Sequence, residues 1–287
     1  GRGSLPGIFI RGTKSAQSLV LVDGQRIANA TSADSNLQFL SVDQIERVEV
    51  LRGSRSVIYG ADAIGGVIQI FTRRGAEQGL KPRLKMGYGS NNSWQRSMGL
   101  SGGDQQTHFN LGVSLDETAG INRSQESFAS DGDDDAYRNK SLSLNLSHQL
   151  DDDIEIGLNL LDNRGKTEFD NSFGRYDPAT QNSVGQQPYS KFDLSSVSTY
   201  FDVRLSEHWK SRLELGHSEN RDTSLDTLSD DRSVFNTYRD SANWQNTLTL
   251  NDRHSLILGT DWYEDRVNSS TVFDEDSRWN RAAFIQH

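Results

Sequence analysis

Residues 40–74, LSVDQIERVEVLRGSRSVIYGADAIGGVIQIFTRR, decide the fold because they join two regions that are built on different patterns. Two runs rich in β-branched residues, 47–51 and 67–71, flank the glycine-rich residues 53–66. β-Branched and aromatic residues favour strands, whereas glycine at this density disfavours a helix of any length. The stretch therefore predicts two strands joined by a long turn segment.

The chain before this stretch predicts further short strands. Residues 7–12 (GIFIRG) are expected to form a strand that glycine closes, and residues 18–27 form two strand-like halves around Asp23-Gly24, which is a strong hairpin signal. Residues 28–36 are small and polar, as in a flexible tip. We expect one small mixed sheet from four pieces: residues 8–10, 19–22, 48–51 and 67–71.

Composition excludes several classes of protein. Only 33% of the 287 residues are apolar, and no run approaches the roughly 20 apolar residues of a membrane-spanning helix. Strands of a membrane barrel remain possible, because each needs only about five apolar positions that alternate with polar ones. The absence of cysteine excludes disulfides and thiolate sites. A net charge of −10 argues against non-specific binding to nucleic acid.

The second region, from residue 83 onward, alternates with the period of strands. Leu142, Leu144 and Leu146 alternate with Ser143 and Asn145. The same alternation recurs in residues 109–115, 154–159 and 256–262. A soluble sandwich shows this alternation too, so the periodicity alone leaves both architectures open.

Connection lengths favour a barrel. Short connections at residues 103–106, 150–153, 206–209 and 251–254 alternate with long ones at residues 117–139, 163–192, 219–240 and 264–280. Short turns on one rim and long loops on the other are typical of outer-membrane barrels. About ten strands are expected, the last at residues 278–287. The five tryptophans are candidates for aromatic girdles or for loop packing: Trp94, Trp209, Trp244, Trp262 and Trp279.

The pattern IERVEVLRG, then YG and AIGGVI, closely resembles the plug domain of TonB-dependent outer-membrane receptors, and the earlier IRG and LVLVDGQRI match in order. The resemblance implies a mostly β protein with a partial plug domain at residues 1–76 (the plug). It also implies the first strands of a transmembrane antiparallel β-barrel at residues 80–287 (the large sheet). The chain is then expected to be a fragment of a longer receptor.

The resemblance implies high-affinity uptake of a scarce nutrient across the outer membrane of a Gram-negative bacterium. Receptors for cobalamin or a related corrinoid are the most similar branch, and a ferric-siderophore receptor is the alternative. Implied partners are a TonB-type energy-coupling protein, the transported ligand and outer-membrane lipid. A passive porin is disfavoured because the first region is a folded domain, and an enzyme is disfavoured because no nucleophile motif accompanies the histidines.

Plug loops of this family point outward and touch the ligand, although a solvated linker is the other interpretation. The residues expected to contact ligand are Ser4, Leu5, Pro6, Asn29, Ala30, Thr31, Ser32, Ala33 and Asp34.

An acidic run at residues 130–137 places four aspartates within five residues. Such density suits a hard cation such as calcium, and a solvated loop is the alternative. The resemblance matches Asp133 and Asp135, with Asp170 from the next long loop, to calcium ligands of the cobalamin receptors. Phe169 stands where that family has tyrosine, and no acid stands near Ser190. One weak site is therefore expected, with Asn122 or Asp131 completing the coordination.

Overall fold

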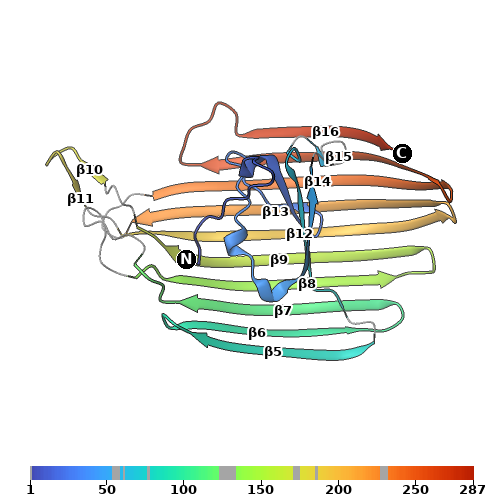
Figure 1. The fold of residues 1–287 in the computed structure, drawn as a ribbon, viewed down its shortest axis with the longest axis horizontal. Coiled ribbons are helices and arrows are strands. Elements are labelled where there is room, and N and C mark those ends of the chain that lie inside the picture. The colour runs from blue at the N-terminus through green and yellow to red at the C-terminus, as the bar shows by residue number, and fades with distance from the viewer. Residues whose placement is uncertain are drawn as a thin grey trace.

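The computed structural model describes residues 2–53, 59–60, 62–75, 78–122, 134–170, 175–184, 187–226 and 232–287. Two sheets carry the fold (Figure 1): a small one in the plug and a large one to which the rest of the chain contributes. The plug lies against the middle of one face of the large sheet. Among the described residues, no helix is long and apolar enough to cross a membrane.

The small sheet is mixed, as the sequence predicts. It consists of β1 (Ser18–Val22), β2 (Gln25–Arg26), β3 (Ile45–Arg52) and β4 (Gly66–Thr72), in the order β2-β1-β4-β3. β1 pairs with β4 in parallel, and the other two pairings are antiparallel. Three short 3-10 helices complete the plug: η1 (Ser15–Gln17), η2 (Leu37–Phe39) and η3 (Val42–Gln44). Of the turn segment predicted at 53–66, residues 54–58 and 61 lie outside the described residues.

The prediction of a strand at residues 8–10 is wrong. Arg11 and Gly12 follow with positive φ angles of 51° and 82°, which turn the chain before it can enter the sheet. The backbone of Ile8 instead pairs with a side chain. Its N–H donates to Ser15 Oγ at 2.8 Å, and the same hydroxyl donates to its carbonyl at 3.2 Å. With its backbone groups satisfied in this way, the segment needs no strand partner.

The Asp-Gly hairpin is confirmed. Asp23 and Gly24 have φ angles of 46° and 86°, the left-handed pair that a tight two-residue turn requires, and Val22 pairs with Gln25. The Asp23 carboxylate also accepts hydrogen bonds from the Thr72 N–H at 3.0 Å and the Thr72 hydroxyl at 2.6 Å. The turn is therefore tied to the end of β4.

The plug should lose stability as the pH rises from about 4, and Asp23→Asn should abolish that loss. Burial raises the pKa of the Asp23 carboxyl, although the bonds from Thr72 favour its ionised form. A carboxyl whose pKa is higher in the folded state binds its proton more tightly there. Stability is then greatest below the unfolded pKa and falls until the folded pKa is passed. Because the chain lacks cysteine, a fluorophore on Phe9→Cys can report plug unfolding against pH. Parallel pH profiles for both proteins would contradict the prediction.

The large sheet has ten strands, which confirms the predicted number. They are β5 (Gly79–Gly89), β6 (Ser93–Gly103), β7 (Thr107–Thr118), β8 (Tyr137–Gln149), β9 (Ile154–Glu168), β12 (Pro188–Ser206), β13 (Trp209–Asp226), β14 (Arg232–Asn251), β15 (His254–Ser269) and β16 (Ser277–Gln286). Each pairs antiparallel with its neighbours in chain order. A small hairpin that the sequence analysis missed, β10 (Arg175–Asp177) and β11 (Asn182–Val184), projects from the second long connection (Figure 1).

The strands are longer than the apolar alternation predicts, so the third and fourth long connections shrink to residues 227–231 and 270–276. At that end, strand pairs are joined by polar contacts. Ser190 donates to Asp222 at 2.5 Å, for example, and Arg239 in β14 forms an ion pair with Asp265 in β15. Polar contacts of this kind between neighbouring strands accompany the strand pairing beyond the part of the sheet that carries apolar residues.

The apolar face of the large sheet points away from the plug. Leu142 pairs with Val113 and Leu144 with Leu111 on that face, and all but Leu144 are well exposed. The opposite face carries Asn139, Ser141, Ser143 and Asn145, which are buried. Asn139 there donates to the carbonyl of Phe39 in the plug at 2.7 Å. This arrangement is the reverse of a soluble sandwich, whose apolar faces point inward.

One apolar cluster joins the plug to the large sheet. Its buried members are Val20, Val22, Ile27, Phe39, Ile70, Tyr137, Leu161, Phe192 and Leu194. The rings of Phe39 and Phe192 stack with centroids 3.7 Å apart. The plug is thus held by an apolar centre surrounded by hydrogen bonds to a polar wall.

Candidate ligand-binding site

Both plug segments predicted to contact ligand lie at the long-connection end of the large sheet. A Cβ on Gly3 would come within 2.3 Å of Thr167 Oγ1, so the chain passes close to the end of β9 just before Ser4. The side chain of Arg2 forms an ion pair with Asp116, near the end of β7. Residues 29–34 reach β14, where the Ala30 N–H donates to Thr237 Oγ1 at 3.1 Å.

Residues 29–34 form a closed turn. The Asn29 N–H donates to the Asp34 carbonyl at 2.9 Å, and the Ala33 N–H donates to the Asn29 carbonyl at 3.0 Å. The side-chain oxygen of Asn29 accepts hydrogen bonds from the N–H and the hydroxyl of Thr31. The turn is therefore built locally and does not depend on ligand for its shape.

The structure divides the predicted contact residues into two groups. Asn29 is 9% exposed and organises the turn, and Ala30, Ala33 and Asp34 are half-buried. Thr31 and Ser32 are exposed at its tip, as are Ser4, Leu5 and Pro6 in the first segment. Of the nine predicted contact residues, these five are the exposed ones.

Besides the bond from Ala30 to Thr237, a second set of hydrogen bonds joins the same plug loop to the large sheet. Asn36 Nδ2 donates to Asn220 Oδ1 at 2.9 Å, and Asn220 Nδ2 donates to the Ile27 carbonyl at 3.2 Å. Asn36 has a left-handed φ of 47°, a conformation that asparagine tolerates well. Asn220 was not predicted, because its part of β13 was assigned to a long loop.

Strands β12 and β13 carry a polar cluster near Asn220 that the sequence did not predict. Ser190 Oγ donates to Asp222 Oδ1 at 2.5 Å, and Ser224 Oγ lies 3.4 Å from the same oxygen. Ser190 and Phe192 share the buried face of β12, and their partners Ser224 and Asp222 share that face of β13. The alternation of Ser190, Phe192 and Leu194 is the signal that could have revealed this strand.

A cavity of about 530 Å³ lies between the plug and β5–β8. Arg2 and Gly3 line it on the plug side together with η2 and η3. Tyr137 and Asp116 line it on the wall side. The Tyr137 hydroxyl donates to the Gln38 carbonyl at 3.2 Å, and because Tyr137 also belongs to the apolar cluster, the cavity borders that cluster.

The predicted calcium ligands are only partly described. Asp133 and Asp131 lie outside the described residues, whereas Asp135 is buried where the first long connection meets β8. The Glu168 N–H donates to the Ala136 carbonyl at 2.9 Å, which brings the chain before Asp170 beside the chain after Asp135. The Asn122 N–H donates to Asp134 Oδ1 at 3.0 Å. No three His, Asp or Glu side chains of the described part cluster as metal ligands, so calcium stays a prediction.

Comparisons with known proteins agree on the family. Residues 1–67 match the TonB-dependent Receptor Plug Domain. The vitamin B12 transporter BtuB of Photobacterium profundum is 28% identical over 287 residues, and that of Vibrio cholerae is 30% identical over 290. Both matches cover 99% of this chain and 45% of the relative, so the chain spans about half the length of the curated relatives it matches.

Solved structures share the fold at low identity. The siderophore receptor PiuA from Acinetobacter baumannii has a TM-score of 0.70 and 16% identity, covering 94% of this chain and 41% of that one. The siderophore receptor PirA from Pseudomonas aeruginosa has a TM-score of 0.67 and 22% identity, covering 99% and 48%. The matched plug model, the relatives that align along the whole chain and the shared fold lead to one conclusion. Over its whole length the chain is similar to the TonB-dependent receptors of the Gram-negative outer membrane, and it has the fold of part of a plug followed by barrel strands.

Proposed function

We propose that this chain is part of the plug and the first barrel strands of a receptor for cobalamin or a related corrinoid. The receptor imports its ligand with energy from a TonB-type protein. The observation that carries the proposal is the extent of similarity to vitamin B12 transporters, which runs through plug and barrel strands alike over 99% of the chain. A plug match alone would be common to the whole family. The work proposed is binding and transport, without covalent catalysis.

The proposed route of import requires the plug to move, because the plug covers the polar face of the large sheet. Outside the apolar cluster, the contacts between them are mainly hydrogen bonds, such as Asn139 to Phe39 and Asn220 to Ile27. Each contributes only about 0.5–1.5 kcal/mol net, because water replaces the lost partner. A pulling force on the plug could therefore exchange these contacts one after another while the barrel strands keep their ladder.

Uptake by living cells tests the proposal. The full-length receptor is expressed in a strain that lacks its own corrinoid receptor, and the entry of labelled cyanocobalamin is measured. We expect uptake that disappears when the energy-coupling protein is deleted. Uptake of a labelled ferric siderophore in the same strain, without cyanocobalamin uptake, would favour the alternative.

The double variant Thr31→Ala/Ser32→Ala should weaken corrinoid binding by about tenfold and lower plug stability less than Asn29→Ala does, because the Thr31 N–H still donates to Asn29. Two exposed hydroxyls lost at about 0.5–1.5 kcal/mol each account for that factor. Asn29→Ala is the matched contrast. It removes the acceptor of both Thr31 hydrogen bonds and should lower plug stability. Isothermal titration and plug unfolding separate the two effects, and unchanged affinity in the double variant would remove the turn from the site.

Calcium is proposed to hold the two long connections together through Asp133, Asp135 and Asp170. An ion that neutralises clustered carboxylates would order both segments before ligand arrives, which reduces the entropy lost on binding. We expect a chelator to lower the corrinoid affinity of the wild type but not that of Asp133→Ala/Asp135→Ala. If calcium leaves the wild-type affinity unchanged, the acidic run is a solvated loop.

A further inference from the structure

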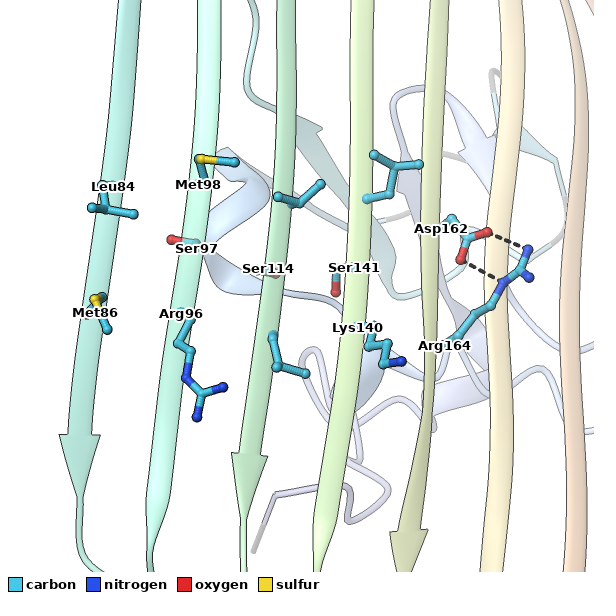
Figure 2. Close-up of a pocket in the computed structure, with 13 residues that line it drawn as sticks. Leu84, Met86, Arg96, Ser97, Met98, Ser114, Lys140, Ser141, Asp162 and Arg164 are labelled. Atoms are coloured by element: carbon cyan, nitrogen blue, oxygen red, sulfur yellow. Dashed lines mark hydrogen bonds and ion pairs between the residues drawn. The ribbon is translucent and has the colours of Figure 1, made fainter.

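A groove of about 800 Å³ crosses the face of the large sheet that points away from the plug, between β5 and β9 (Figure 2). Its apolar lining includes Leu84, Met98, Val113 and Leu142. These side chains are 38–73% exposed, although leucine, valine and methionine are among the residues most often buried. The lining therefore suits an apolar occupant.

Three basic residues line one side of the groove, in one row of paired residues that runs across the strands. Arg96 and Lys140 both pair with Leu115, and Lys140 also pairs directly with Arg164. Figure 2 shows Lys140 next to Arg164 and shows Arg96 on the far side of β7, in the row beside Met98 and Leu84. Neighbouring strands lie about 4.8 Å apart, so the two directly paired cations repel each other.

Acidic neighbours neutralise two of these cations but not the third. Arg164 forms ion pairs with Asp162 at 2.6 Å and Asp193 at 3.2 Å. Arg96 lies 3.5 Å from Glu117. For Lys140, within the part of the chain that the structure describes, no ion pair is found, although it is exposed between two arginines of the row. The row thus has an ammonium group available for an external anion.

On this face, the rows of paired residues between Met98 and the short turns are apolar. One row across β6–β9 consists of Leu100, Leu111, Leu144 and Leu160. The next row includes Phe109, Leu146 and Leu158. The basic row therefore lies at the border between an apolar band and the long-connection end. A cation at such a border meets the headgroups of a membrane.

We propose that the groove binds a phosphate-bearing lipid of the leaflet on the long-connection side. One acyl chain lies over Met98, Val113 and Leu142, and the phosphate contacts Lys140 between Arg96 and Arg164. An anion at that point offsets the repulsion between Lys140 and Arg164, and the apolar floor holds the chain that carries it. A protein partner would have to bring both an acid and an apolar surface into the lipid band.

Native mass spectrometry of the full-length receptor in a neutral detergent tests this proposal. The probes are bisphosphorylated lipid A, zwitterionic phosphatidylcholine and inorganic phosphate. We expect one lipid A to stay bound in preference to phosphatidylcholine, and inorganic phosphate not to displace it. Lys140→Gln should weaken retention about fivefold, the factor that follows from one basic residue at an anionic surface. Lys140→Arg should retain the lipid.

Lys191→Gln is the matched control, because Lys191 is exposed but lies outside the groove. It should retain lipid A like the wild type. Equal losses in Lys140→Gln and Lys191→Gln would overturn the proposal in favour of a diffuse positive field. Equal retention of phosphatidylcholine, or displacement by inorganic phosphate, would overturn it as well. Unchanged corrinoid binding in Lys140→Gln verifies that the variant is folded.

Discussion

Phe39→Ala should lower the free energy of unfolding of the plug by about 3–5 kcal/mol, the cost of removing a buried aromatic side chain. Phe39 is 4% exposed and belongs to the cluster that joins the plug to the large sheet. Its ring stacks on Phe192 with an interplanar angle of 4°, and Tyr137 lies beyond with its centroid 6.0 Å from that of Phe192. Alanine would leave a cavity between two sheets that cannot close without moving the plug.

The fluorophore on Phe9→Cys can follow this unfolding, since all five tryptophans lie in the large sheet. Val42→Ala serves as a control, because Val42 is 78% exposed only three positions away. We expect a change below about 0.5 kcal/mol there. Similar losses in the two variants would show that the stacked rings do not hold the plug.

Asp265→Ala should also be severe, at about 3–5 kcal/mol, because it leaves buried charge without its partner. Asp265 is 1% exposed and forms ion pairs with Arg239 and with Arg278, the latter at 2.9 Å. Arg239 also donates to the plug carbonyls of Arg26 and Ala28 at 3.3 and 3.4 Å. The variant therefore disturbs both the large sheet and its hold on the plug chain that leads into the turn at residues 29–34.

Hydrogen exchange of residues 26–34 measures that hold directly. Protection should fall in Asp265→Ala and remain in Glu49→Ala, which breaks the exposed Arg47–Glu49 pair in the same plug. Exposed pairs contribute only about 0–1 kcal/mol. If residues 26–34 stay fully protected in Asp265→Ala, the buried ion pair does not position the turn.

The sequence was most informative where one physical constraint acts alone. Leu142, Leu144 and Leu146 alternate because one face meets apolar surroundings, and this constraint revealed the strands correctly. Beyond the apolar band the face that points away from the plug becomes polar, as at Lys191 and Asp193, so the strands continue past Ser190 and Asp222 without the outward apolar residues that marked them and were assigned to loops. At residues 8–10 the composition favours a strand, but the chain turns away at Arg11 and Gly12.

For the proposed ligand site, the sequence indicates segments and not individual residues. Small polar residues marked 29–34 as a loop, but only the tertiary structure separates Asn29, which organises the turn, from Thr31 and Ser32, which are exposed. Asn220 and Asp222 come from β13, which is distant in sequence from the plug. The contacts of Asn220 with the plug depend on strand register, which no local pattern encodes.

Direct binding to the purified full-length receptor tests the central claim most sharply. Cyanocobalamin and a ferric siderophore are each titrated against it in detergent with calcium present. The account predicts saturable binding of cyanocobalamin with one site per receptor and no heat from the siderophore. Saturable binding of the siderophore with no binding of cyanocobalamin would contradict it.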